Sequence, residues 1–247
     1  MLSKGGFPGV SNSFGATLWT VDYTLQMAST GYSAAYMHTR ERGTTYNLFD
    51  YPAPGNNQWS TNPTYYAYFP LLQALQSSNG SRVLDLNVGG SNSSNAGYAI
   101  YDSSTKDIYR IVLFNYANAT DPVDFSVQQG MVPNTGKNVT IKYLTAPSVN
   151  EQTRISWNGT TWAGVGDGKP ISSGTDGDIS MDCVNGCSVR VPSPGLAVLV
   201  VNKNLPNNNS TTTTGGHNSN SAAPFAGPVL SFMIFALIIP LIMEVYQ

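Results

Sequence analysis

The sequence predicts a protein of the α+β class, mostly β, in which helical segments come first and an antiparallel β-sandwich follows. Between residues 11 and 80, apolar side chains recur at spacings of three and four, as on one face of a helix. From Arg82 onward the apolar residues alternate with a period of two, and turn residues separate nearly all of these segments. Many short strands of this kind are typical of a β-sandwich.

The N-terminal part predicts a helix, a strand, a long loop and a second helix. The first helix covers residues 11–28, with Ser11 or Ser13 as its N-cap and Gly31 closing it. Its buried side carries Phe14, Leu18, Val21, Leu25 and Ala28. Residues 34–38 follow as a candidate buried strand.

A polar loop rich in Gly and Pro runs from Thr39 to Ser60, and structureless loops of about 20 residues are uncommon in compact domains unless they line a site. A second helix starts at Asn62, with Pro63 at its first position and a kink at Pro70. Its predicted buried residues are Tyr65, Tyr66, Phe69, Leu72 and Leu75. One such α/β unit cannot bury its own strand, so residues 1–80 need further chain to cover them.

The second domain, residues 81–203, is predicted to be the β-sandwich. Its strands are 83–88, 98–101, 109–116, 123–127, 139–144, 155–157, 179–183, 188–191 and 196–202. Residues 138–143 alternate polar and apolar side chains, as a half-exposed strand does. Residues 196–201 are apolar throughout and predict a central strand.

The composition argues against a nucleic-acid-binding protein and indicates no cofactor or metal. Charged residues make up 11% of the chain, below the usual one quarter or so, and the formal net charge is −2. The Lys and Arg residues are scattered singly, whereas a phosphate-binding face needs them clustered. No spacing of side chains indicates a metal cluster, a phosphate-binding glycine loop or a Ser-His-Asp arrangement.

The two cysteines, Cys183 and Cys187, flank a Val-Asn-Gly sequence that is a strong tight-turn signal. We interpret them as a disulfide across a β-hairpin, in the oxidising compartment that secretion implies. Two free thiols of a cytosolic protein are one alternative. A zinc site is the other, and it would have to recruit His38 or His217.

Sequons of the form Asn-x-Ser/Thr predict a glycosylated, secreted protein. They lie at Asn79, Asn92, Asn118, Asn138, Asn158, Asn208 and Asn209. In a chain this rich in Asn, Ser and Thr several would arise by chance, so the sequons support secretion without establishing it.

The C-terminus predicts attachment to a membrane at the cell surface. Residues 204–224 form a stalk rich in Ser, Thr and Asn, and residues 225–247 contain an uncharged apolar run close to the about 20 residues that cross a bilayer. No Lys or Arg follows this run, and small residues from Asn218 precede it. A glycosylphosphatidylinositol signal is therefore favoured over a retained transmembrane helix, and a buried core helix is the weakest alternative. Because residues 1–9 contain no apolar leader, we expect that Met1 is not the natural start.

Several groups of residues, taken in order, carry a resemblance to a known family. The run from Gly9 to Tyr23 (GVSNSFGATLWTVDY) is the most specific. The others are Gly5-Gly6, His38, Tyr46-Asn47-x-Phe49, Pro63-x-Tyr65-Tyr66 and the segment from Val191 to Val198. Residues 1 to about 203 thus resemble the C-terminal part of family 79 glycoside hydrolases, which include fungal and bacterial β-glucuronidases and heparanase.

The resemblance implies that residues 1–80 are the last strand-helix units of a (β/α)8 barrel packed beside the β-sandwich. In that family, retaining hydrolysis removes or cleaves at a β-linked uronic acid. One carboxylic acid protonates the leaving oxygen, and a carboxylate about 5 to 5.5 Å away attacks the anomeric carbon. By resemblance, both glutamates lie before Met1, the nucleophile only a few residues before the position of Gly5-Gly6.

The resemblance leaves part of the substrate pocket within this chain. Gly5, Gly6, Gly43 and Tyr46 match positions that hold the uronate carboxylate through charge-assisted hydrogen bonds from backbone amides and a phenol. His38 matches a strand end that faces the site. A uronic-acid-containing glycan is therefore the implied partner.

The glutamates of the chain itself are Glu41, Glu151 and Glu244, and Glu41 alone is near the expected site. Its neighbours Arg40 and Arg42 indicate a solvated charge cluster, although either arginine is a candidate second anchor for an acidic sugar. Fungal members commonly have Gly-Gly-Gln after the histidine, where this chain has Thr-Arg-Glu-Arg-Gly.

The sequence therefore predicts the C-terminal fragment of a secreted β-glucuronidase-like hydrolase that is inactive alone. A longer gene product that is an active enzyme is one alternative. Another is a cell-surface glycoprotein whose β-sandwich is a noncatalytic adhesion or carbohydrate-binding module, with Trp59, Trp157 and Trp162 stacking on sugar rings.

Overall fold

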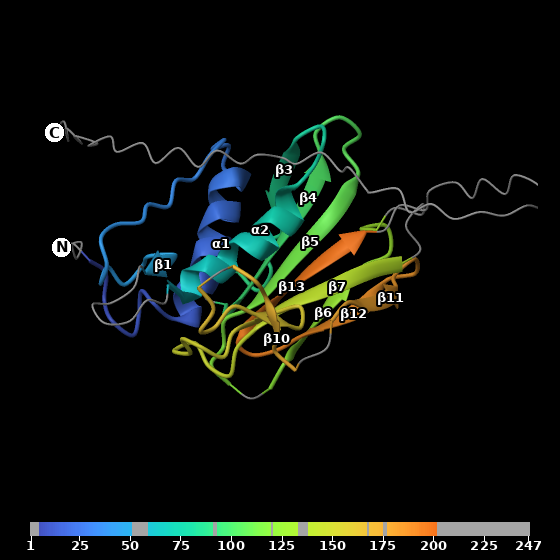
Figure 1. The fold of residues 1–247 in the computed structure, drawn as a ribbon. Coiled ribbons are helices and arrows are strands. Elements are labelled where there is room, and N and C mark those ends of the chain that lie inside the picture. The colour runs from blue at the N-terminus through green and yellow to red at the C-terminus, as the bar shows by residue number, and fades with distance from the viewer. Residues whose placement is uncertain are drawn as a thin grey trace, which may run out of the picture. The chain divides into compact units, whose positions relative to one another are not determined.

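The fold is organised around an antiparallel sheet with a hydrophobic core on each face (Figure 1). The computed structural model describes residues 5–50, 59–90, 93–119, 121–132, 138–166, 168–174 and 177–201, all within the unit formed by residues 1–207. Outside them lie Asn92, Asn208, Asn209, Asn218, the predicted stalk and the predicted tail. In this described part, no helix is long and apolar enough to cross a bilayer.

Nine of the described strands form the large sheet, in the order β10-β9-β8-β7-β13-β5-β4-β3, with β11 paired to β7. The strands are β3 (Ser81–Asp85), β4 (Asn95–Asp102), β5 (Ile108–Asn115), β7 (Asn138–Thr145), β8 (Ser156–Trp157), β9 (Thr160–Thr161), β10 (Ile171–Ser172), β11 (Ile179–Asp182) and β13 (Gly195–Val201). β13 lies between β5 and β7, with Leu199 opposite Ile111 and Ile141. The predicted central strand is therefore confirmed.

A second, two-stranded sheet consists of β6 (Val123–Val127) and β12 (Cys187–Val191). Phe125 and Val189, opposite each other in this pair, turn inward and join a core with Ile111, Ile141 and other residues of the large sheet. The mostly β, antiparallel class is confirmed. The short strands β9 and β10 were not predicted, because two residues are too few to show a period.

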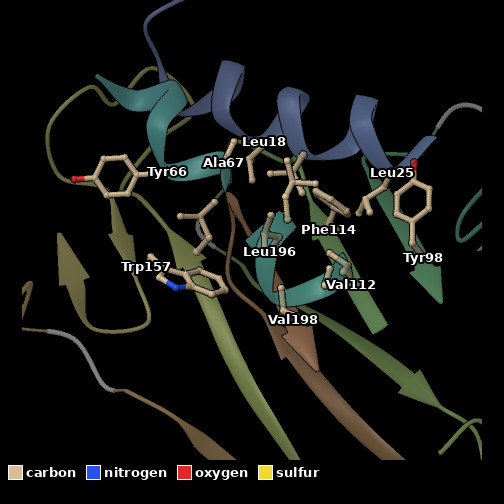
Figure 2. Close-up of a cluster of buried hydrophobic side chains, with 14 of the residues drawn as sticks. Leu18, Leu25, Tyr66, Ala67, Tyr98, Val112, Phe114, Trp157, Leu196 and Val198 are labelled. Atoms are coloured by element: carbon tan, nitrogen blue, oxygen red, sulfur yellow. The ribbon is translucent and has the colours of Figure 1, made fainter. Parts of the chain in front are cut away.

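Helices cover the other face of the large sheet. They are α1 (Phe14–Ser29), the 3₁₀ helix η1 (Pro63–Ala67) and α2 (Tyr68–Leu75), and a short ladder of β1 (Phe49–Asp50) with β2 (Ser60–Thr61) precedes η1. Figure 2 shows Leu18 and Leu25 pointing from α1 toward Phe114 and Leu196 of the sheet. All four side chains are at most 1% exposed, and burying each contributes roughly 1.5–3 kcal/mol. The first predicted helix is confirmed.

Two predictions for residues 34–75 are wrong. Residues 34–38 form no strand, and Tyr36 is 92% exposed, because a lone strand needs a neighbour to pair with and the described residues supply none. Leu72 was expected to be buried but is 58% exposed, while Leu71 and Ala74 are buried. The reason is that η1 winds with three residues per turn, which rotates the buried stripe relative to an α-helix begun at Pro63.

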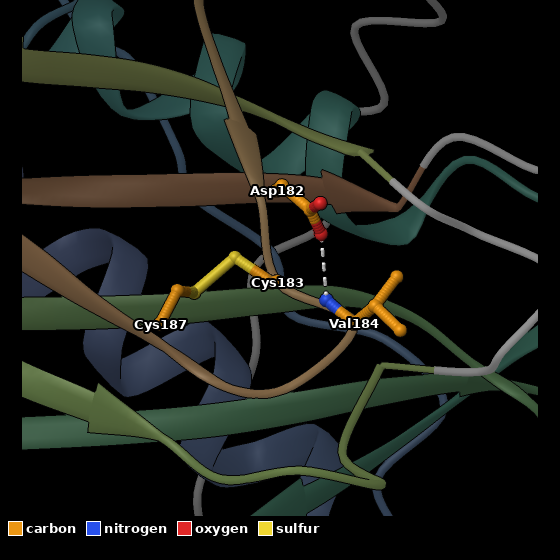
Figure 3. Close-up of a disulfide and its surroundings, with 4 residues drawn as sticks. All are labelled: Asp182, Cys183, Val184 and Cys187. Atoms are coloured by element: carbon orange, nitrogen blue, oxygen red, sulfur yellow. Dashed lines mark hydrogen bonds between the residues drawn. A yellow bond between two sulfur atoms is a disulfide. The ribbon is translucent and has the colours of Figure 1, made fainter.

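The disulfide between Cys183 and Cys187 is confirmed, and a hydrogen bond from the Val184 amide to Asp182 at 3.0 Å closes the turn beside it (Figure 3). The β-hairpin predicted around it is wrong. β11 pairs with β7 of the large sheet, whereas β12 pairs with β6. The disulfide therefore lies where the chain crosses from one sheet to the other, because each strand finds a longer ladder elsewhere.

The first turn of α1 is held by the loop before β8 rather than by a capping side chain. The amide of Phe14 donates to the Glu151 carbonyl at 2.8 Å, and that of Gly15 donates to the Val149 carbonyl at 2.7 Å. The Glu151 carboxylate fixes this loop by accepting hydrogen bonds from the backbone amides of residues 152–154 and from the Arg154 side chain. Burial tends to raise the pKa of Glu151, but these hydrogen bonds lower it to about 2.

We predict that Glu151→Gln destabilises the protein by about 1–3 kcal/mol at pH 7, because the charge-assisted hydrogen bonds are weakened. Since the folded pKa lies below the unfolded one, the contribution of Glu151 is complete above about pH 4.5 and is lost as the pH falls through about 2. Urea unfolding from pH 7 to pH 2 should therefore show a smaller pH dependence in the variant. Glu41→Gln, at an exposed carboxylate, is the control and should match the wild type. Equal pH profiles for all three proteins would contradict the assignment.

Candidate functional site

The candidate site is a cavity of about 350 Å³ between the N-terminal turn, α1 and the loop before η1. Most of its lining is apolar or aromatic, with a few polar groups converging on one side, as is usual for a small-molecule site. The lining residues are Gly6, Phe7, Ser11, Ala16, Trp19, Thr20, Tyr36, Met37, His38, Tyr46, Leu48, Thr64 and Tyr68. Three of the predicted site residues, Gly6, His38 and Tyr46, thus line one cavity.

The N-terminal turn is fastened to the loop that carries Tyr46. The Gly5 carbonyl accepts hydrogen bonds from the Thr45 amide at 2.8 Å and from the Thr45 hydroxyl at 2.7 Å. Gly6 has a φ of +75°, and a Cβ there would overlap the side chains of Thr45 and Ser11. Glycine is therefore required at position 6 both by the backbone conformation and by the close approach of the loop.

Asn47 holds this loop in shape from a fully buried position. Its side-chain oxygen accepts from the Thr39 hydroxyl at 2.9 Å and from the Arg40 amide at 2.8 Å, while its amide group donates to the Glu41 carbonyl and to Asp50, both at 3.0 Å. All the hydrogen-bonding capacity of one Asn side chain is thus used. The sequence showed Asn47 only as part of a motif, and its role as the organiser of residues 39–50 was missed.

His38 and Tyr46 form the polar wall of the cavity. The His38 Nε2 lies 3.1 Å from the Tyr46 hydroxyl, and the two rings meet edge to face with centroids 5.2 Å apart. The Thr64 hydroxyl donates to the carbonyls of Tyr46 and Asn47, at 3.3 and 3.1 Å, which fixes the backbone beneath the phenol. An imidazole and a phenol in contact supply hydrogen-bond donors and acceptors without a fixed charge.

The remaining predicted residues lie apart from the cavity lining. Gly43 is exposed, with a φ of +88°. Arg40 pairs with Glu41 at 3.2 Å, and both side chains are largely exposed, which matches the predicted solvated charge cluster. Sequence reasoning missed the aromatic residues Trp19 and Tyr68 of the lining, because nothing in a helical period distinguishes a cavity wall from a core contact.

No carboxylate belongs to the described lining of the cavity. In residues 5–50 and 59–80, the acidic side chains are engaged elsewhere. Asp22 accepts from the Tyr98 hydroxyl at 2.6 Å, and Asp50 accepts from Asn47 and from Asn62. The described part of the cavity thus offers polar contacts for a ligand and no pair of acids for hydrolysis.

Four sequons fall on described residues. Asn79, Asn118 and Asn138 are exposed, as a glycan would require. Asn158 is half-buried, and its amide donates to Asp178 at 2.6 Å. Glycosylation at these positions stays a prediction.

Comparison with solved structures first identifies the fold of the chain. It is a fold found in glycoside hydrolases. The 4-O-α-L-rhamnosyl-β-D-glucuronidase of Fusarium oxysporum 12S superposes on 80% of this chain and on 41% of its own, with a TM-score of 0.64 and 22% identity. Over the same fold, residues 97–199 match the glycosyl hydrolase family 79 C-terminal beta domain.

Two curated relatives agree with this assignment. A β-glucuronidase of Aspergillus niger is 28% identical over 209 residues, which is 73% of this chain and 38% of the relative. A β-glucuronidase of Neurospora crassa is 36% identical over 76 residues, which is 30% of this chain and 13% of the relative. Residues 97–199 therefore match the C-terminal β domain of glycosyl hydrolase family 79, and the resemblance to the C-terminal part of that family is confirmed. The chain spans well under half the length of these relatives.

We predict that Asn47→Ala loosens the candidate site without unfolding the protein. Loss of the Asn47 acceptor removes this hydrogen bond from the Arg40 amide, and a partly buried hydrogen bond of this kind contributes about 1–3 kcal/mol locally. Amide hydrogen exchange of residues 40–47 should become at least about tenfold faster. Arg42→Gln, at an exposed position of the same loop, should leave exchange unchanged. Unaltered exchange in Asn47→Ala would mean that Asn47 does not organise the loop.

Proposed function

We propose that this chain is the C-terminal fragment of a secreted, β-glucuronidase-like retaining hydrolase, and that it binds part of a uronic-acid-containing glycan without cleaving it alone. The observation that carries the proposal is the cavity in which Gly6, His38 and Tyr46 converge, with no acidic side chain among the described residues of its lining. The family 79 β domain over residues 97–199 and the names of the fungal relatives support the same substrate class.

The chemistry explains why such a fragment would be inactive. Cleavage of a glycosidic bond needs an acid to protonate the leaving oxygen and a carboxylate facing it across the sugar. The Tyr46 phenol and the backbone amides near Gly6 can hold an anionic substituent, because they donate hydrogen bonds to a carboxylate. Binding and orientation would thus come from this chain, and proton transfer and attack from residues outside it.

The outer face of α1 supports a role as part of a larger fold. Trp19 is 56% exposed and Tyr23 43% exposed, and their rings stack with centroids 4.9 Å apart. Phe7 and Val10 beside the turn are 58% and 64% exposed. Exposed aromatic and aliphatic side chains at this density usually mark a surface that is covered by other polypeptide. We propose that the remaining units of a (β/α)8 barrel cover it, with residues 1–80 as its last part.

Secretion, N-glycosylation and a lipid anchor near Asn218 remain part of this proposal. They rest on the sequons and on the stalk and apolar run of residues 204–247. The disulfide between Cys183 and Cys187 is consistent with an oxidising compartment.

The alternative function is a noncatalytic carbohydrate-binding module. The tryptophans that suggested it give it little support. Trp157 and Trp162 are 9% and 6% exposed, and Trp162 stacks on Phe69 inside the core. Trp59 is 51% exposed. A planar row of exposed sugar-stacking rings from these three residues is therefore absent.

We predict that the purified chain releases no p-nitrophenol from p-nitrophenyl β-glucuronide. A chimera in which this chain replaces the matched region of the Aspergillus niger β-glucuronidase should hydrolyse it, because the chimera supplies the acids. In the chimera, Tyr46→Phe should raise KM about tenfold, a loss of one charge-assisted hydrogen bond, while Tyr32→Phe, at an exposed ring, serves as the control. Turnover by the chain alone that disappears in Glu41→Gln would overturn the proposal.

A further inference from the structure

A short segment of the β-sandwich contacts β2 and η1, the elements that follow the loop of Tyr46. It comprises β9 and the residues 162–166 that come directly after it, and we call residues 160–166 the clamp segment. The clamp segment lies within residues 97–199, which match the family 79 β domain. Tyr46, β2 and η1 all precede that domain, so these contacts join two parts of the chain that are far apart in sequence.

Tyr66 of η1 makes the first contact with the clamp segment. Its hydroxyl accepts a hydrogen bond from the Trp162 backbone amide at 2.6 Å and lies 2.8 Å from the Thr161 hydroxyl. Tyr66 is 2% exposed, and in Figure 2 its hydroxyl points away from the middle of the core. The Trp162 ring stacks on Phe69 of α2, with centroids 4.1 Å apart. Loss of the Tyr66 hydroxyl would leave a buried amide without this acceptor, which is costly away from water.

β2 makes the second contact with the clamp segment. The Thr61 hydroxyl donates to the Val165 carbonyl at 2.8 Å. A Cβ on Gly166 would lie 2.5 Å from the Trp59 carbonyl oxygen, so the two backbones approach as closely as glycine alone permits. The clamp segment is therefore attached both to β2 and to η1.

Thr64 transmits the position of η1 to the candidate site. It lies two residues before Tyr66 in η1, lines the cavity, and donates to the carbonyls of Tyr46 and of the residue after it. β2 acts in parallel, because Thr61 pairs with Phe49 of β1, three residues after Tyr46. Both elements that fix the backbone around Tyr46 are thus held by the clamp segment.

We propose that the clamp segment positions the Tyr46 phenol for the uronate carboxylate, so that Tyr66 is a positioning residue for substrate recognition. The inference rests on the proposed function, in which the phenol binds this carboxylate. A hydrogen bond weakens steeply when its distance and angle depart from their best values, and one made to a carboxylate is among the stronger ones. The β domain therefore contributes to the recognition of uronic acids through η1 rather than by direct contact with the sugar.

Amide hydrogen exchange of the full chain tests whether the clamp segment controls the site. Tyr66→Phe removes the hydroxyl and keeps the ring, so exchange at residues 161–165 and at residues 44–48 should become about tenfold faster. Tyr65→Phe is the matched control and should leave exchange unchanged, because the Tyr65 hydroxyl has no hydrogen-bond partner among the described residues. Faster exchange at residues 161–165 alone would overturn the inference, since the change would stop short of Tyr46.

Thr61→Val is a second variant for the case in which Tyr66→Phe fails to fold. It keeps the shape of the side chain and removes the hydrogen bond to the Val165 carbonyl. Exchange at residues 44–48 should again become faster, by about threefold or more. In that case, unchanged exchange at these residues would overturn the inference.

A double-mutant cycle in the chimera tests whether Tyr66 acts through the Tyr46 phenol. Tyr66→Phe should raise KM for p-nitrophenyl β-glucuronide about three- to tenfold with kcat nearly unchanged, as expected for a loss of uniform binding. In a Tyr46→Phe background the same substitution should change KM less than about twofold, because the phenol that it positions is gone. Equal increases of KM in both backgrounds would show that Tyr66 has a general structural role, which contradicts the proposal.

These experiments also separate the inference from the proposed function. A chimera without glucuronidase activity would contradict the proposed function, while faster exchange at residues 44–48 in Tyr66→Phe would still support the positioning of the loop. An active chimera whose KM is unaffected by Tyr66→Phe would overturn the inference and leave the proposed function intact.

Discussion

The rest of the structure depends on the docking of α1 against the large sheet. Phe14, Leu18 and Leu25 are almost wholly excluded from solvent, and their burial drives the contact. Two polar contacts then fix its position. The first turn of α1 donates backbone hydrogen bonds to the loop at Val149 and Glu151, and Asp22 accepts one from Tyr98 of β4. Because the hydrophobic effect has no direction, these hydrogen bonds are what set the helix in one orientation.

The geometry of the candidate site depends on the position of the docked helix α1. The Gly5–Gly6 turn lies shortly before α1, from which residues 7–13 separate it, and Thr45 ties the loop of Tyr46 to this turn. On the other side, the Thr17 hydroxyl of α1 donates to the Pro63 carbonyl at 2.8 Å, which places η1 and the end of the same loop. Contact between His38 and Tyr46 is therefore a consequence of hydrogen bonds made to α1 and to the turn before it, and the sheet holds α1 in place.

The outer face of α1 exposes side chains that a folded protein normally covers. Trp19 and Tyr23 are 56% and 43% exposed there, on the side of α1 away from the large sheet. Packing against further helices, as in the proposed barrel, would cover them.

The sequence by itself determined the elements with a clear period, namely α1 and the strands from β3 to β13 of four or more residues. Periodicity suffices for them because it records which side chains share a face of one element. The disulfide followed from the tight-turn signal between the two cysteines, and the family resemblance selected Gly6, His38 and Tyr46, which line one cavity. Only the tertiary structure decided that β11 and β12 belong to different sheets, that residues 34–38 are exposed, and that Asn47 organises the loop. These outcomes depend on which distant segments are available as partners, and no local pattern of residues encodes that.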